Sequence, residues 1–174
     1  GLAAASLGWQ ARAELLRGRY EEAISLYLEQ ARTGDNAAQL SLEMVCDRVS
    51  KADRAVLARV AKHPLSRQIV TIYVVSLAGH RDWSPDAPSA QFPKLWLSAV
   101  EQADAQDMPE AERLTWLAYQ CDDMKLAERW LQRAPQASPV TKWLRAKLLL
   151  YDGKIEPAVK LLAEAARQLP TDES

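Results

Sequence analysis

Apolar residues recur at helical spacing through most of the chain, and short polar breaks separate the helical segments. Near the N-terminus, Leu2, Leu7, Trp9 and Leu16 form an apolar stripe over residues 3–17. Apolar residues three and four positions apart lie on one face of a helix. The break at Gly18 is followed by a second helical pattern that ends at the next glycine, because glycine readily adopts the left-handed turn after a helix. The pattern predicts a helical hairpin over residues 3–33.

The C-terminal third contains this unit twice, in residues 109–139 and 140–170. Each copy has a helical pattern, a short polar turn, a second helical pattern and a closing proline, and Ala127 and Ala158 occupy the same place in the two copies. Residues 109–170 are therefore expected to form two further hairpins of the same design.

The middle of the chain, residues 36–106, is helical but less regular. Asn36 is expected to cap one helix and Ser50 the next, because their side chains suit that position. The β-branched run 69–75 is compatible with a buried strand or with a helix over 65–78. The helix is favoured because the chain offers no second strand to pair with it.

A long irregular segment, residues 79–90, follows this run. Two prolines and a glycine exclude a continuous helix there, and loops of this length in a compact domain are usually functional or mobile. Another helix is expected over residues 91–105. The sequence thus predicts ten helices in five antiparallel pairs, each of which needs its neighbours to bury its apolar face.

The repeated unit resembles the tetratricopeptide repeat (TPR), a helix–turn–helix unit with a small residue on its first helix and an alanine twelve places later on its second. A Sel1-like variety of the same repeat is a related interpretation. The turn before the second helix is matched by Gly18-Arg19-Tyr20 and Gly153-Lys154-Ile155. The small pairs are Ala11 with Ala23, Thr115 with Ala127, and Ala146 with Ala158.

This resemblance implies an all-α fold, a right-handed α–α superhelical solenoid of about five helical hairpins. It implies a single domain over residues 1–170, with regular repeats at 3–35, 109–139 and 140–170, degenerate helical pairs at 36–106 and a polar tail at 171–174. The last two units are 31 residues apart, which departs from the 34-residue period of the family.

In TPR arrays the first helix of each pair faces a concave groove, and this position predicts the partner-binding residues. Aromatic side chains mixed with Arg, Lys and Gln are the types that dominate binding energy at protein interfaces. The alternative is that these aromatic residues simply pack between neighbouring helices. The groove candidates are Arg12, Leu16, Trp116, Tyr119, Gln120, Trp143, Lys147 and Tyr151.

Composition narrows the function classes further. The chain has 174 residues, of which 48% are apolar and 26% charged, and a net charge of -1. No basic field favours nucleic acid, and no apolar run is long enough to insert into a membrane. Phosphate-loop and metal-ligand spacings are absent, so no cofactor or metal is expected. Cys46 and Cys121 are expected to be buried free thiols, although spacing alone does not exclude a disulfide.

The two histidines offer little chemistry. His63 precedes a proline at a predicted helix end, where a cation suits the last carbonyl groups. His80 lies in the long loop near Asp82 and Trp83, and an enzyme with a site in this 80–90 loop is one alternative.

The leading hypothesis is a non-catalytic protein–protein interaction module that binds a protein or peptide partner in a concave groove. A second alternative is a periplasmic scaffold of a bacterial envelope or polysaccharide-export system, and a third is a spacer between other domains. The chain opens at Gly1 without methionine, so we expect a piece of a longer or processed chain. The compartment, cytoplasm or periplasm, stays open.

Overall fold

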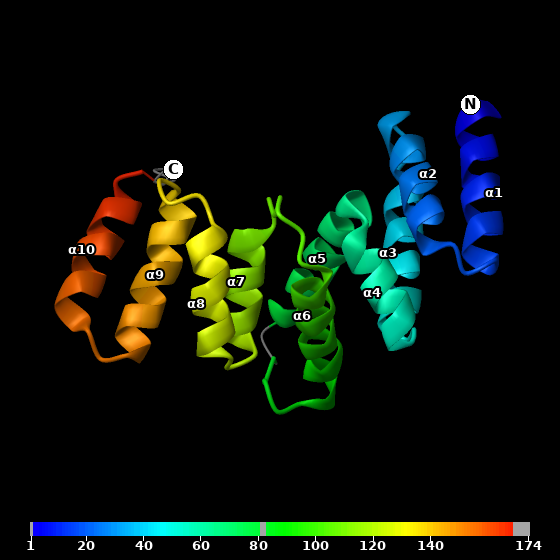
Figure 1. Ribbon diagram of the computed structural model, residues 1–174. Helices are drawn as coiled ribbons and strands as arrows, with labels where there is room; N and C mark the ends of the chain where they lie inside the picture. Colours follow the sequence, from blue (N-terminus) through cyan, green and yellow to red (C-terminus); the bar gives the residue numbers. More distant parts are fainter. Residues whose placement is uncertain (1, 81–82, 169–174) are drawn as a thin grey trace. The chain divides into compact units, whose positions relative to one another are not determined.

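The computed structural model describes residues 2–80 and 83–168, and these residues form helices and connecting turns without any strand (Figure 1). The predicted polar tail at 171–174 and Asp82 lie outside the described residues. The elements are α1 (Leu2–Leu16), α2 (Tyr20–Arg32), α3 (Ala37–Ser50), α4 (Arg54–Lys62), α5 (Pro64–Ala78), the 3-10 helix η1 (Pro88–Ala90), α6 (Gln91–Ala103), α7 (Ala111–Gln120), α8 (Met124–Arg133), α9 (Pro139–Tyr151) and α10 (Ile155–Ala166).

The chain divides into two compact units. Gly1–Gly79 and Leu95–Ala105 form the N-terminal unit, and His80–Lys94 and Gln106–Ser174 form the C-terminal unit. The boundary falls inside α6, which begins in the C-terminal unit and continues in the N-terminal one.

The N-terminal unit begins with the predicted hairpin. The α1 and α2 helices pack closely around the turn at Gly18, whose φ of +71° is a left-handed conformation that glycine adopts without strain. Ala11 on α1 and Ala23 on α2 are fully buried, and small side chains at both positions let the two backbones approach. The α2 helix then packs on α3 and α5, and α3 also contacts α5.

In the same unit, α6 is joined to α5 by a buried contact. Trp96 is fully buried, and its Nε1–H donates a hydrogen bond of 3.0 Å to Oγ1 of Thr71. The predicted helix over 65–78 is confirmed as α5, so the β-branched run is helical.

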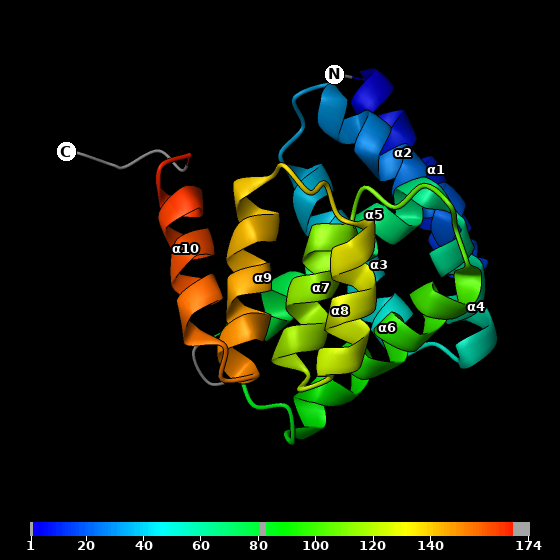
Figure 2. The ribbon, with the colours of Figure 1, turned by 60° about the vertical axis from the view of Figure 1, so that its left-hand side comes forward.

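The C-terminal unit contains the two remaining regular hairpins, α7 with α8 and α9 with α10. Figures 1 and 2 show these four helices side by side, and α9 contacts both α7 and α8. The predicted small pairs are again buried: Thr115, Ala127, Ala146 and Ala158 have no exposed surface. In the turn between α7 and α8, Asp122 has a left-handed backbone conformation (φ 61°), and Gly153 has one in the turn between α9 and α10 (φ 75°).

One predicted helix cap, Ser50, is wrong, and Asn36 stands at its predicted N-cap position without a capping hydrogen bond. Asp53, not Ser50, caps α4: its Oδ1 accepts the Val56 N–H at 2.9 Å, whereas the Ser50 hydroxyl bonds back to Asp47 in the last turn of α3. Asn36 makes no side-chain cap for α3.

His63 lies at the end of α4, as predicted, and is also the N-cap residue of α5. Its Nδ1 accepts the Ser66 N–H at 3.4 Å, at the start of α5.

The long loop is anchored at two points inside the C-terminal unit. The Nε1–H of Trp83 donates to the Gln120 backbone carbonyl at 3.2 Å, and Nζ of Lys94 donates to the Pro85 carbonyl at 2.7 Å. Apart from η1, the described part of this loop is irregular, as predicted.

Candidate interaction surfaces

One candidate surface is the outer face of α1, which we call the α1 surface: Leu2, Ala5, Trp9, Arg12 and Leu16. Leu2 is 94% exposed, Trp9 72% and Leu16 70%. At 100° per residue these five positions fall within one stripe of the helix.

A second side of α1 is also apolar and is buried in the hairpin with α2, through Ala4, Ala11 and Leu15. The predicted single stripe is therefore split, because Leu2, Trp9 and Leu16 are exposed instead of packing on α2. A helix that is apolar on two sides is usually covered on both.

Two members of the α1 surface, Trp9 and Arg12, carry polar groups. Among the described residues, neither the Trp9 indole N–H nor the Arg12 guanidinium has a hydrogen-bond, ion-pair or cation–π partner. Arg12 and Leu16 were predicted from the sequence as groove residues, whereas Leu2 and Trp9 were not. The seven-residue spacing from Leu2 to Trp9 to Leu16 was the signal that could have found them.

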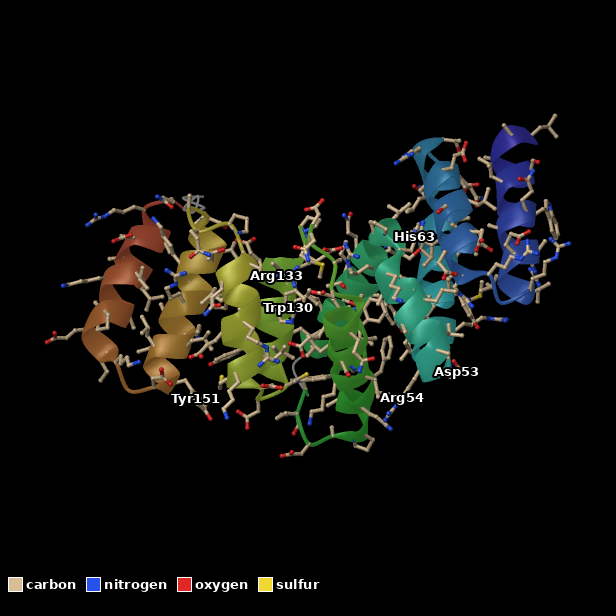
Figure 3. All side chains as sticks on the ribbon, in the orientation of Figure 1. Asp53, Arg54, His63, Trp130, Arg133 and Tyr151 are labelled. Atoms are coloured by element: carbon tan, nitrogen blue, oxygen red, sulfur yellow. The ribbon has the colours of Figure 1, made fainter. Side chains whose placement is uncertain are left out.

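The second candidate surface lies on α7 and α9 in the C-terminal unit. The predicted residues Trp116, Tyr119 and Gln120 are half-buried on α7, on the side away from its buried residues. On α9, Trp143 and Lys147 are half-buried, and Tyr151 is 61% exposed. Figure 3 labels Tyr151 at the C-terminal end of α9.

Two residues that the sequence reasoning missed extend the α9 part of this surface. Val140 and Leu150 are exposed, and they lie on the same side of the helix as Trp143, Lys147 and Tyr151. Leu150 follows Trp143 by seven positions, so helical spacing could have identified it. We define the α9 surface as Val140, Trp143, Lys147, Leu150 and Tyr151.

A direct hydrogen bond fixes α9 beside α7. The Thr141 hydroxyl donates to Oε1 of Glu112 at 2.7 Å, and Thr141 is buried between the helices. The aromatic residues of α7 and α9 therefore belong to neighbouring helices within one unit. Within α9, Nζ of Lys147 lies 5.2 Å from the centroid of the Trp143 ring, a cation–π contact.

The predicted site residues thus fall into two sets. Arg12 and Leu16 lie in the N-terminal unit, and the other six lie in the C-terminal unit. Two tryptophans that were not groove candidates, Trp96 and Trp130, are buried, and Arg133 lies 4.8 Å from the Trp130 ring centroid (Figure 3).

A shallow depression of about 480 Å³ lies beside the α1–α2 turn and is lined partly by Glu14, Glu21 and His63. Two of the carboxylates that line it are held in ion pairs. Glu14 pairs with Arg17 at 2.8 Å, and Glu21 pairs with Arg59 at 2.7 Å. The hydrogen bond that Arg59 donates to Glu21 raises the pKa of Arg59 above its ordinary value. Arg59 also donates to the Gly18 carbonyl at 2.9 Å, so its side chain ties the α1–α2 turn to α4.

The described residues show little that favours catalysis. No group of three His, Cys, Asp or Glu residues within them could hold a metal ion. Cys46 and Cys121 are buried free thiols, as expected. Burial raises the pKa of Cys46 to about 12 and that of Cys121 to about 11, which keeps both thiols protonated and unreactive near neutral pH. His80, around which an enzyme site was one alternative, is exposed.

Within the described part of the chain, none of the helices has the length and apolar character needed to cross a bilayer.

Comparison with known proteins bears on the fold. No protein-family model matches the chain, and the search of curated proteins found no significant match. Among solved structures, a thermophilic TPR protein from Thermus thermophilus matches with a TM-score of 0.50. The match covers 98% of this chain and 93% of that chain, at 18% sequence identity.

The fold is TPR-like. The predicted all-α helical-repeat class and the resemblance to TPR proteins are therefore confirmed at the level of the fold. At 18% identity, the match shows the fold alone.

Proposed function

We propose that this TPR-like chain is a non-catalytic interaction module that binds a protein or peptide through the exposed sides of α7 and α9. The observation that carries the proposal is the α9 surface, where two aromatic and two aliphatic side chains surround one lysine and remain accessible. Exposed apolar groups gathered on one side of a helix are typical of binding sites.

The chemistry of this surface suggests what it binds. Trp143 and Tyr151 are residue types that contribute most to binding when they become buried. Lys147 stacks on Trp143 and places a positive charge among them. A partner segment with apolar side chains and a carboxylate would meet both features, and a rigid pair of neighbouring helices holds the residues in place.

The test is affinity capture with the purified chain, followed by identification of the bound protein and titration of that purified protein against variants. Trp116→Ala/Trp143→Ala/Tyr151→Ala should lose the partner, while Glu156→Ala/Lys160→Ala, two exposed polar residues on α10, should keep it. Circular dichroism establishes that each variant is folded.

Because Trp116 and Trp143 are half-buried, a second pair of changes tests the surface without removing packing. Lys147→Glu and Tyr151→Glu each place a negative charge on the α9 surface, and each should weaken binding by about tenfold or more. Binding that is unchanged in both of these variants and in the triple variant would overturn the proposal.

A further inference from the structure

The α1 surface has the spacing of a coiled-coil seam. Leu2, Trp9 and Leu16 are seven residues apart, and Ala5 and Arg12 each follow three positions later, which matches the a and d positions of a heptad. All five side chains are exposed, over a helix about 22 Å long. The structure of this face therefore fits another helix better than an extended chain or a small molecule.

We propose that a second copy of this chain occupies the α1 surface, with the two α1 helices antiparallel about a twofold axis. In the register that pairs a with d positions, Ala5 of one copy lies opposite Leu16 of the second copy, and Trp9 lies opposite Arg12 of the second copy. Each contact occurs twice by symmetry. The small Ala5 side chain of each copy then faces the larger Leu16 of the other copy, and each Arg12 guanidinium lies over a Trp9 indole ring.

The complementarity of Trp9 and Arg12 is the reason to choose a second copy as the occupant. Both side chains lack a partner within the described chain, and the antiparallel pair supplies each with the other. The same kind of contact already occurs twice in this molecule, with Arg133 4.8 Å from the Trp130 ring centroid and Lys147 5.2 Å from that of Trp143. A parallel pair would instead place Arg12 opposite the same arginine of the second copy, which is repulsive.

The size of the surface sets the expected strength. One 15-residue helix from each copy provides less than the roughly 800 Å² per partner of a standard stable interface. The pair should therefore be reversible, and the fraction of dimer should rise with protein concentration.

Sedimentation velocity on the whole chain, over a wide concentration range, tests the pairing. The average mass should rise from the 19.4 kDa of the monomer toward twice that value. Trp9→Glu should keep the chain monomeric. Gln10→Glu introduces the same charge at the next residue, which is exposed on another side of α1, and should associate like the unaltered chain.

Changing the charge of the side chain at position 12 tests the role of the Arg12 cation. Arg12→Glu should weaken association by about tenfold, because both cation–π contacts are lost, whereas Arg12→Lys should keep most of it.

Disulfide trapping tests the orientation. A mixture of the Ala5→Cys and Leu16→Cys variants should form a mixed cross-linked dimer in higher yield than either variant alone, because the antiparallel register brings these two positions together. Preferential cross-linking of Ala5→Cys to itself would overturn the antiparallel register.

A chain that stays monomeric at every concentration, or a Trp9→Glu variant that associates like the Gln10→Glu control, would overturn the pairing. So would a different protein bound to a monomer through α1. The pairing is separate from the function proposed for α7 and α9: Trp9→Glu should leave capture of that partner unchanged, and Tyr151→Glu should leave the sedimentation mass unchanged.

Discussion

The tryptophans show how the surroundings of one residue type decide its role. Trp96 has no exposed surface, and its indole N–H is bonded to Thr71, whereas Trp9 is mostly exposed and its indole has no partner among the described residues. A buried indole contributes through packing and through a satisfied polar group. An exposed one contributes almost nothing to folding and remains available for binding.

Trp96→Phe should lower the free energy of unfolding by about 2–3 kcal/mol, because it removes a buried hydrogen bond and leaves a space where the larger ring was. The matched change Trp9→Phe should alter it by less than about 0.5 kcal/mol. Urea unfolding followed by circular dichroism measures both. Equal effects of the two substitutions would show that Trp96 is not part of the packed core.

Gly8 and Gln30 form a second residue-scale pair. A Cβ added at Gly8 would lie 3.0 Å from Oε1 of Gln30, a buried side chain that donates from Nε2 to Asp35 at 2.8 Å. Gly8→Ala should therefore destabilise the chain by about 1 kcal/mol, even though alanine is the better helix former. In a Gln30→Ala background the same change should stabilise it, by up to about 1 kcal/mol. Additive effects in this double-mutant cycle would contradict the contact.

Spacing located the residues that face away from the hairpins, but it did not separate the two apolar sides of α1. Arg12, Leu16, Trp143 and Tyr151 follow from their position on a first helix. Trp9 was placed with Leu2, Leu7 and Leu16 in one apolar stripe, because the sequence alone does not show which apolar residues of this helix pack on α2. The fit of Ala11 to Ala23 decides which side of α1 packs on α2. This is a tertiary contact, so the spacing of residues within α1 does not show it.

At the scale of elements, the helix boundaries depend on which nearby polar side chain reaches the free N–H groups. Asp53 reaches the Val56 N–H, and Asp123 reaches the Leu126 N–H at 3.0 Å at the start of α8. Ser50 lies too far back along the chain, inside the last turn of α3. Several residues in this stretch could cap a helix, so the sequence predicted the existence of α4 but not its first residue.

Asp53→Ala should cost about 1 kcal/mol of stability, because it removes the cap of α4. Ser50→Ala removes only a bond to a carbonyl inside its own helix and should cost less than half as much. The two variants, compared by thermal unfolding, distinguish the observed cap from the one expected from sequence. A larger effect at Ser50 would contradict the observed start of α4.

Asp35 connects α2 to α3 and makes this connection sensitive to pH. Hydrogen bonds from Gln30 and from the Ala37 N–H lower the pKa of Asp35 below its ordinary value. Its stabilising contribution is therefore complete above the pKa of the unfolded chain, about 3.9, and is lost as the pH falls through the lower folded-state pKa.

Asp35→Asn should remove this contribution to the pH dependence, because the amide does not titrate but can still accept the Ala37 N–H. Urea unfolding at pH 5 and at pH 3 compares the two chains. The unaltered chain should lose more stability between these pH values than the variant does. An identical loss in both would show that Asp35 does not contribute.

At the scale of the whole molecule, the three regular hairpins follow from local rules. A small residue on each helix and a left-handed turn between them are visible in the sequence, and the fold match over nearly the whole chain agrees. The middle was less predictable because its contacts join elements that are distant in sequence. The packing of α2 on α5 and of Trp96 on Thr71 leaves no periodic mark, since each depends on how separate helices come together.

Helical repeats gain stability from burial against their neighbours, so a helix that buries few large side chains should open most easily. The α10 helix has only Ala158 and Ala165 fully buried, whereas α8, which also contacts α9, buries its larger Leu126, Trp130 and Leu131. Hydrogen–deuterium exchange should therefore be faster for the backbone amides of α10 than for those of α8. For the same reason, Val159→Lys on the exposed side of α10 should change the free energy of unfolding by less than about 0.5 kcal/mol. Equal protection of the two helices would mean that the C-terminal unit opens only as a whole, which requires contacts across α10 stronger than two alanines provide.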